Sequence, residues 1–292
     1  MTTDAWFAGV ASDESDGSDD TDEAVAHIRE GRADAPADWP TQAVESGFAA
    51  DEEQYYEKLR AATLAAARTA VAERERADDK QLVHAVRAMD DAERTANELA
   101  ERLAEWAGTL FDDAGSGVGY ARELAGSEPE TPAEQPVVSF AGRVADLADE
   151  ADDLREFIER RAPDVAPNLA EMAGPVLAAR LMSLAGGLDA LAKKPSGTVQ
   201  VLGAEDALFA HLAGRATSPK HGVIFTHEYV RGTRSEDRGS AARAFAGKLT
   251  LAARVDHYGD EFKQELHDDL RERIETIRAR ADEGDENGGD DE

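Results

Sequence analysis

The longest regular pattern of apolar positions lies between residues 78 and 110. The positions advance by alternating steps of three and four residues: Leu82, Ala85, Met89, Ala92, Ala96, Leu99, Leu103, Trp106 and Leu110. Such steps place one apolar stripe along an α-helix, and a sustained stripe packs along its length against another helix. Asp78 or Asp79 is a suitable N-terminal cap. We therefore predict a long helix that forms one arm of a coiled coil.

A second stripe with the same spacing follows after a break. Its members are Phe140, Val144, Leu147, Ala151, Leu154 and Ile158. The glycine-rich residues 115–119 and the polar residues 126–136 separate the two stripes, and Pro163 and Pro167 are expected to end the second arm. Residues 78–165 are therefore predicted to form an antiparallel coiled-coil hairpin.

Further helices are predicted on both sides of the hairpin. Residues 51–77 contain neither Gly nor Pro and are predicted to form a linker helix. Further helices are predicted at residues 168–191, 204–212, 238–256 and 260–280. Two short β-prone runs, 198–202 and 223–225, are predicted to be extended segments between helices. The fold class is all-α: a long antiparallel coiled-coil hairpin plus a compact helical C-terminal domain at residues 166–282.

The two ends of the chain are acidic. Residues 1–50 are predicted to be a short, largely disordered N-terminal segment, and residues 283–292 a disordered acidic tail. Trp6 and Phe7 form an isolated apolar cluster ahead of a low-complexity stretch. Two interpretations remain open for this pair: a peptide that docks on a partner protein, or an anchor that folds back onto the chain's own helices.

Composition limits the function classes. The net charge is −30, and 7 Lys stand against 25 Arg, which suits a protein that works in molar salt, where the Debye length is about 3 Å. An acidic protein that binds basic partners is the alternative. Cysteine is absent, which excludes disulfides and thiolate metal sites. No membrane span or secretory signal is recognisable, so we expect a cytoplasmic protein.

Charge is distributed unevenly along the chain. Residues 170–258 hold eleven Lys and Arg against eight Asp and Glu, a net of +3 in a strongly acidic protein. A surface for a polyanion explains such an island, and chance clustering of arginines is the alternative.

The helix predicted from Arg238 onward offers the clearest candidate surface. Apolar residues Ala242, Phe245, Leu249 and Ala252 share a stripe that we expect to be buried. Arg243, Gly247, Thr250 and Arg254 share a different face, flanked by Lys248. Two guanidinium groups separated by small residues suit a phosphate backbone, whereas the alternative is a solvated face with helical salt bridges.

The loop at residues 218–222 is a second candidate. Lys220 is a cation for phosphates, and His221 suits a phosphate or an unpaired base, although a hydrogen bond that caps the loop also explains a histidine there. His227 follows, but no third ligand lies at metal-binding spacing. We found no catalytic triad, phosphate-binding loop or paired carboxylates in a plausible cleft, so neither an enzyme nor a metal or cofactor site is predicted.

Several sequence blocks carry a family resemblance. GPVLAARL, LAGGLDALAKKPSGTVQVLGAED, PKHGVIF and KLTLAARVD occur in the order typical of the Nop domain family, and the similarity extends upstream to about residue 78. The chain resembles the scaffold proteins of archaeal box C/D guide ribonucleoproteins. The resemblance implies a non-catalytic protein that binds kink-turn guide RNA jointly with a small kink-turn-binding ribosomal-type protein, self-associates through its coiled coil, and positions the methyltransferase fibrillarin for 2′-O-methylation of ribosomal RNA.

The resemblance also suggests site residues. Those expected to bind RNA are Lys220, His221, Arg238, Arg243, Lys248 and Arg254, and those expected to bind partner proteins are Gly203, Ala204, Glu205, Trp6 and Phe7. Asp206 and Ser240 replace lysines that are usual in the family, and the N-terminal region is shorter than usual. A truncated paralogue that binds RNA without recruiting the methyltransferase, or a coiled-coil assembly protein without RNA, are the alternatives.

Overall fold

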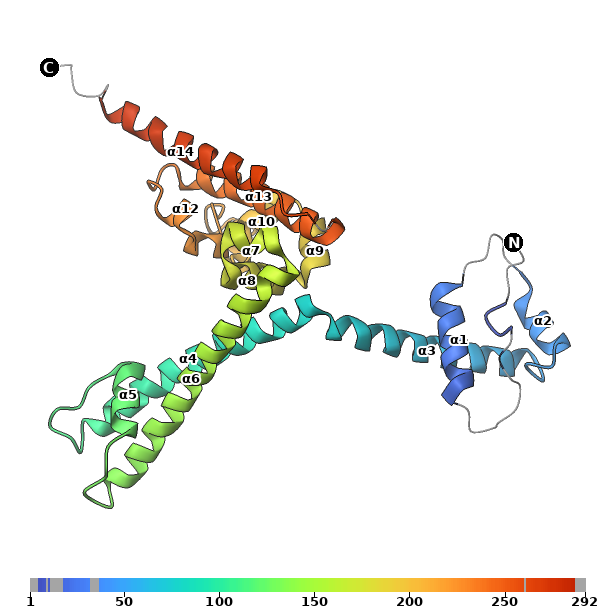
Figure 1. Cartoon of the computed structure of the whole chain (residues 1–292), viewed down its shortest axis with the longest axis horizontal. Helices are drawn as coiled ribbons and strands as arrows, with labels where there is room; N and C mark the ends of the chain where they lie inside the picture. Colours follow the sequence, from blue (N-terminus) through green and yellow to red (C-terminus); the bar gives the residue numbers. More distant parts are fainter. Residues whose placement is uncertain (1–4, 9, 11–17, 32–36, 260, 287–292) are drawn as a thin grey trace. The chain divides into compact units, whose positions relative to one another are not determined.

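Figure 1 shows the computed structural model of the chain, which describes residues 5–8, 10, 18–31, 37–259 and 261–286. Every regular element in these ranges is helical, which confirms the predicted all-α class. The chain divides into two compact units, one ending at Ala77 and the other beginning at Asp78. No helix within the described residues is long and apolar enough to cross a membrane.

The N-terminal unit is a small folded body. It comprises α1 (Ser18–Glu30), α2 (Trp39–Glu45) and α3 (Glu52–Arg76), and both shorter helices contact α3. An aromatic cluster fills its core. The Trp6 indole N–H donates to the Tyr55 hydroxyl at 3.2 Å, and the Phe7 ring stacks on Phe48 with centroids 5.0 Å apart.

One prediction for this region is therefore wrong, and one of the two interpretations left open is supported. Residues 1–50 are not largely disordered in the part that the structure describes, because α1 and α2 are formed, although residues 11–17 lie outside the described ranges. Of the two interpretations for Trp6 and Phe7, the structure supports the anchor that folds back onto the chain, because the two residues are 6% and 7% exposed in the unit's own core. Each aromatic side chain looked isolated in the sequence, and only the fold brings them together.

Helix α3 belongs to this unit rather than acting only as a linker. Its start is set by a reciprocal cap: Asp51 accepts a hydrogen bond from the Gln54 amide at 2.8 Å, and the Gln54 side chain accepts one from the Ala50 amide at 2.7 Å. Lys58 then holds the preceding turn by donating to the Phe48 carbonyl at 2.6 Å. These contacts join α3 to the aromatic core.

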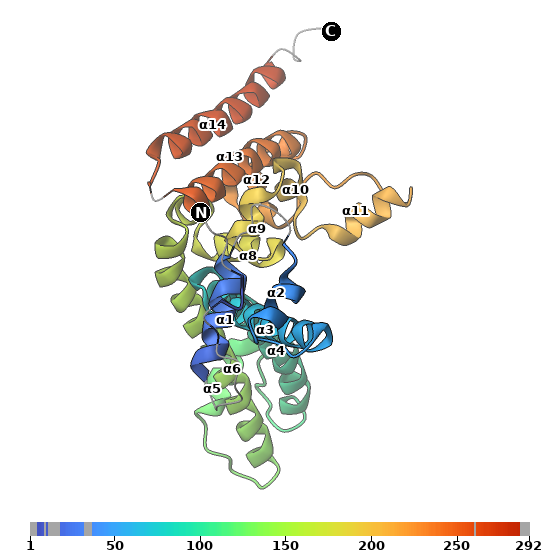
Figure 2. The same ribbon diagram turned by 90° about the vertical axis from the view of Figure 1, so that its right-hand side faces the viewer.

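The coiled-coil hairpin is confirmed. Its arms are α4 (Asp78–Ala107) and α6 (Glu134–Val165), which lie side by side in Figures 1 and 2. A helix that was not predicted, α5 (Gly117–Ala125), packs between the arms near the tip, where Leu103, Leu124 and Val144 share a small core. Helix α6 continues through Pro163 to Val165, because a proline in the last turn interrupts only one main-chain bond.

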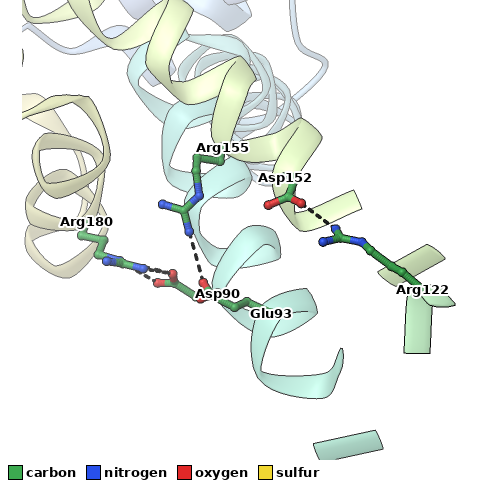
Figure 3. A network of polar contacts seen from close by, with 6 residues as sticks. All are labelled: Asp90, Glu93, Arg122, Asp152, Arg155 and Arg180. Carbon is green, nitrogen blue, oxygen red and sulfur yellow. Dashed lines mark hydrogen bonds and ion pairs between the residues drawn. The ribbon is translucent and has the colours of Figure 1, made fainter. Parts of the chain in front are cut away.

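Three ion pairs, drawn in Figure 3, hold the hairpin together and join it to α8. Nε of Arg180 lies 3.2 Å from both carboxylate oxygens of Asp90, and hydrogen bonding to that carboxylate is the main cause that raises the pKa of Arg180. The other two pairs are Arg155 with Glu93 at 3.4 Å and Arg122 with Asp152 at 2.7 Å. Exposed ion pairs contribute roughly 0–1 kcal/mol each to stability, so the buried apolar residues between α4 and α6 contribute most of the stability of the hairpin.

The remaining helices form the compact part of the C-terminal unit. They are α7 (Pro167–Ala173), α8 (Pro175–Ala185), α9 (Leu188–Lys193), α10 (Ser196–Val201), α11 (Glu205–Leu212), the 3₁₀ turn η1 (Val223–Thr226), α12 (Glu228–Arg231), α13 (Arg238–Tyr258) and α14 (Gln264–Glu286). In Figure 2, α11 extends away from the others. The two runs predicted as extended are instead helical, in α10 and η1, because short apolar runs do not distinguish strands from buried helical turns.

Helix α14 is longer than predicted. It continues to Glu286, past the expected start of the acidic tail, and the last six residues of the chain lie outside the described ranges. Its residues Leu270, Ile274 and Ile277 are buried. Helix α13 is the centre of the unit and contacts α7, α9, α10, α12, α14 and η1.

One buried polar clasp joins the start of α7 to the end of α13. Asn168, 1% exposed, donates from its side chain to Asp256 at 2.7 Å and to the Glu261 carbonyl at 3.0 Å, and accepts from the Lys263 amide at 2.8 Å. Asp256 also accepts from the Leu169 amide at 2.8 Å.

Replacing Asn168 is expected to destabilise the C-terminal unit. The Asn168→Ala variant removes three hydrogen bonds and leaves buried groups without partners, so the free energy of unfolding should fall by about 2–4 kcal/mol. Urea unfolding followed by circular dichroism measures this. The control is Asn97→Ala on the exposed surface of α4, which should change stability by less than about 0.5 kcal/mol. If the two substitutions lower the free energy of unfolding equally, the hydrogen bonds of Asn168 do not stabilise the unit as expected.

His267 on α14 is expected to make stability depend on pH. Its side chain is 6% exposed, stacks on Phe262, and has an Nε2 atom without a hydrogen-bond partner among the described residues. Burial is the largest cause that lowers the pKa of His267, and the charge of Glu171 opposes it. Below a pH of about 6.5 the unfolded chain therefore binds more protons than the folded chain, and stability decreases as the pH falls.

The measurement is the melting temperature between pH 7 and pH 5.5. Acidification should lower it, and His267→Gln should lose part of this dependence because glutamine does not titrate. His221 and His227, whose pKa values are also lowered by burial, contribute to the dependence that remains. His211→Gln, at an exposed position of α11, is the control and should melt with the native pH dependence. If His267→Gln keeps the full native dependence, the buried imidazole is not the cause.

Candidate nucleic-acid interface

A polar hollow of about 490 Å³ lies between α10, the start of α13 and the loop that precedes η1. It brings together two of the predicted RNA-binding residues, Lys220 from the loop and Arg243 from α13. The rest of its lining comes from Gly197, Gln200, Val201, Ser218, Pro219, Glu236, Gly239 and Ser240. Two cations, hydroxyl groups and one carboxylate suit a polar ligand with a limited number of negative charges.

Hydrogen bonds from one side chain and one main-chain amide hold the loop against α10. The Gln200 side chain donates to the Lys220 carbonyl at 2.7 Å, and the Gly222 amide donates to the Gln200 carbonyl at 2.9 Å. A Cβ atom on Gly222 would lie 1.9 Å from the Leu202 carbonyl oxygen, so only glycine fits there. The position of Lys220 is therefore set by backbone geometry.

Two more predicted residues, His221 and Arg238, form a stack beside the hollow. The His221 ring lies on Phe225 with centroids 4.5 Å apart and planes 17° apart, and the Arg238 guanidinium lies over the same phenyl ring at 5.4 Å. Burial, followed by the charge of Arg238, lowers the pKa of His221. At neutral pH the imidazole is therefore an uncharged aromatic surface, which suits stacking on a base better than pairing with a phosphate.

The other two predicted cations are held by contacts within the chain. Nζ of Lys248 lies 2.7 Å from the Asp269 carboxylate on α14, and Nε of Arg254 donates to the Ala192 carbonyl at 3.0 Å. Thr250, expected on the open face, is 3% exposed and donates to the Ala246 carbonyl at 2.8 Å. The predicted buried stripe of α13 is confirmed, since its four residues are at most 1% exposed. The predicted cationic face of α13 is thus not fully open. Residues of α9 and α14 already bind the side chains of Arg254 and Lys248 at its C-terminal half.

The predicted partner-binding residues after α10 lie beside a second hollow. Gly203, with φ of +80°, lines a space of about 400 Å³ together with Arg180, Leu184 and Val223. The Gly203 amide donates to the Glu205 carboxylate at 2.9 Å, and α11 begins at Glu205.

Helix α11 exposes large apolar side chains. Phe209 is 63% exposed and Leu212 is 72% exposed, and both lie one to two turns beyond Glu205. Large apolar side chains exposed on a helix that extends away from the rest of the unit suit a protein partner. Trp6 and Phe7, the other predicted partner-binding residues, lie in the core of the N-terminal unit and do not share in this surface.

Sequence reasoning missed part of the lining. Gln200 and Glu236 were not singled out, because only the fold brings α10 and the turn before α13 to the same hollow. Ser240, where the family usually has lysine, does lie in the hollow, whereas Asp206 lies in the first turn of α11. Within the described residues no group of three His, Cys, Asp or Glu side chains is arranged to hold a metal ion.

Comparison with known proteins finds relatives of one kind, NOP5 family and nucleolar proteins. An uncharacterised NOP5 family protein of Methanocaldococcus jannaschii is 35% identical over 237 residues, which cover 68% of this chain and 57% of the relative. Nucleolar protein 56 of Saccharomyces cerevisiae is 34% identical over 178 residues, 60% of this chain and 35% of the relative. This chain therefore spans less than two thirds of the length of these curated relatives.

The fold is also found in a solved structure. A crystal structure of a fibrillarin/Nop5p complex contains a chain similar to this one with a TM-score of 0.52 and 25% identity, covering 90% of this chain and 93% of that one. The family profile described as the snoRNA binding domain, fibrillarin, matches residues 48–277, from α3 through most of α14. Because that match spans most of the chain, the chain belongs to the Nop family.

Proposed function

We propose that this protein is the scaffold of a box C/D guide ribonucleoprotein. It binds a kink-turn guide RNA together with a small kink-turn-binding protein, and it positions fibrillarin for 2′-O-methylation of ribosomal RNA. The observation that carries this proposal is the hollow shared by Lys220 and Arg243, which lies beside the His221 stack. The Nop family profile and the similarity to a chain in a fibrillarin/Nop5p complex support it.

The size and charge of the hollow favour RNA that is already held by another protein. Its two cations face one carboxylate, Glu236, so few phosphates are neutralised there. Salt weakens binding in proportion to the number of phosphates neutralised, so a site with few such contacts depends less on ionic strength and more on shape and stacking. The neutral ring of His221 supplies such a stacking surface, and Arg238 donates beside it.

The surface for the small RNA-binding protein is assigned to Gly203, Ala204, Glu205 and the exposed residues of α11. Phe209 and Leu212 supply the apolar area that a protein interface needs. Lys248 and Arg254 are left out of the RNA site, because Asp269 and the Ala192 carbonyl already occupy these side chains.

The N-terminal unit is assigned to fibrillarin. It binds through its folded surface, and Trp6 and Phe7 support that surface from within. The scaffold itself supplies position rather than chemistry, so no residue of this chain is given a catalytic role. A cytoplasmic location stays a prediction from the sequence.

Variants of the hollow test the RNA site. Lys220→Ala and Arg243→Ala should each weaken the complex of chain, small protein and kink-turn RNA by about 1–3 kcal/mol, since each removes charge-assisted hydrogen bonds. The measurement is a gel shift in molar salt with the small protein present. Arg102→Ala, an exposed arginine on the hairpin arm paired with Glu105, is the control and should bind as the native chain does.

Native affinity in both hollow variants would remove this surface from the RNA site. Adding fibrillarin to the same mixture separates the two candidate roles of the chain. A scaffold retains the enzyme in the assembled particle, whereas a truncated paralogue binds RNA and the small protein without it.

The hairpin tip is assigned to self-association. Trp106 and Leu110 are 42% and 38% exposed near the tip, and the double variant Trp106→Ser with Leu110→Ser should turn a dimer into a monomer. Light scattering of the full chain at tens of micromolar in molar salt measures this. The double variant Leu64→Ser with Val71→Ser removes comparably exposed residues of α3 and should remain dimeric. A native chain that is monomeric under these conditions contradicts the assignment.

A further inference from the structure

Helix α14 contacts the residues next to the stack of His221, Phe225 and Arg238 through Arg271, which interacts with Tyr229, and through Arg278. Arg278 donates from Nη2 to the Glu228 carbonyl at 2.9 Å, and its Nε lies 3.4 Å from the Thr233 hydroxyl. Figure 1 shows α14 beside α13, with α12 close by. Arg278 thereby connects the last helix to both ends of the turn formed by residues 228–233.

That turn is closely packed. Thr233 is 3% exposed, and its hydroxyl donates to the Tyr229 carbonyl at 2.8 Å. A Cβ atom on Gly232 would lie 2.7 Å from the Glu228 carbonyl oxygen and 3.2 Å from Nη2 of Arg278. The guanidinium therefore lies directly against the backbone of the turn, with no room for a side chain at residue 232.

The same turn positions the stack. The Thr233 carbonyl accepts a hydrogen bond from Nε of Arg238 at 3.0 Å, and this bond holds the Arg238 guanidinium over Phe225. Phe225 in turn stacks on His221, the neighbour of Lys220. A continuous series of contacts thus leads from Arg278 through Thr233 and Arg238 to the residues that face the hollow.

We propose that Arg278 is a positioning residue for the RNA site: it holds the turn at residues 228–233 so that Arg238, Phe225 and His221 keep their stacked arrangement. The part of this inference that concerns RNA rests on the proposed function, whereas the part that concerns the stack does not. Arg278 is the first residue beyond the family match, which ends at residue 277.

A direct effect of the Arg278 charge on RNA is a separate explanation, and the chain offers a matched control for it. Arg273 lies on the same helix and is exposed. Arg278→Gln and Arg273→Gln remove the same charge from α14, but only the first removes the contacts to Glu228 and Thr233. In molar salt the Debye length is about 3 Å, so the loss of a distant charge has little effect at the hollow.

The first measurement uses the full chain without RNA. The pKa of His221 is followed by NMR of the imidazole protons in the native chain and in the two variants, with circular dichroism to confirm that each is folded. Burial and the charges of Arg238 and Lys220 lower this pKa in the native chain. We expect Arg278→Gln to raise it toward the ordinary histidine value, because Arg238 loses its fixed place, and Arg273→Gln to leave it unchanged.

The second measurement is the affinity of the chain for kink-turn RNA with the small protein present. Arg278→Gln should raise the dissociation constant about three- to tenfold, as expected for the loss of an orienting hydrogen bond, and Arg273→Gln should not. Arg278→Lys keeps the charge with a single donor group and should not restore native affinity.

Three outcomes distinguish the possible failures. An unchanged His221 pKa in folded Arg278→Gln overturns the inference. A shifted pKa with native RNA affinity also overturns it, because the stack then does not serve RNA. Absence of RNA binding by the native chain contradicts the proposed function instead, and the NMR result then still decides whether Arg278 positions the stack.

Discussion

The packing around the alanine-rich surface of α13 is the constraint on which the C-terminal unit depends. Ala241, Ala242, Ala246, Ala252 and Ala253 are fully buried around Phe245. Small side chains let neighbouring helices approach closely, and α13 is accordingly contacted by α7, α9, α10, α12 and α14. The residues of the candidate site lie either on α13 or on segments held against it. A larger side chain within this surface would displace several elements at once.

Local periodicity was enough to predict the hairpin and the buried stripe of α13. Both depend on contacts between residues three or four apart, which repeat regularly along a helix. The partners of Lys248 and Arg254 were not predictable in this way, because they come from residues 269 and 192 on other helices. A helical face that its sequence pattern predicts to be exposed can thus be partly covered by other helices of the same chain.

The same reasoning explains the error at the N-terminus. Trp6 is separated from Phe48 and Tyr55 by a long stretch of mostly polar sequence, and no local pattern links it to them. Their rings lie within 6.1 Å of Trp6 in the folded unit. Acidic composition correctly indicated a small apolar content, but the aromatic side chains, including Phe7, together with a few alanines form a small core once α3 supplies a surface for them.

The backbone of the loop at residues 218–222 leaves the charge of the hollow free to vary. Gly222 is fixed by the Leu202 carbonyl, and the loop is held to α10 by main-chain hydrogen bonds and by the Gln200 side chain. The Ser218 and Ser240 side chains also line the hollow but take no part in these contacts. Cationic and neutral side chains at residues 218 and 240 are therefore both compatible with this backbone, so the net charge of the hollow can change while the fold stays the same.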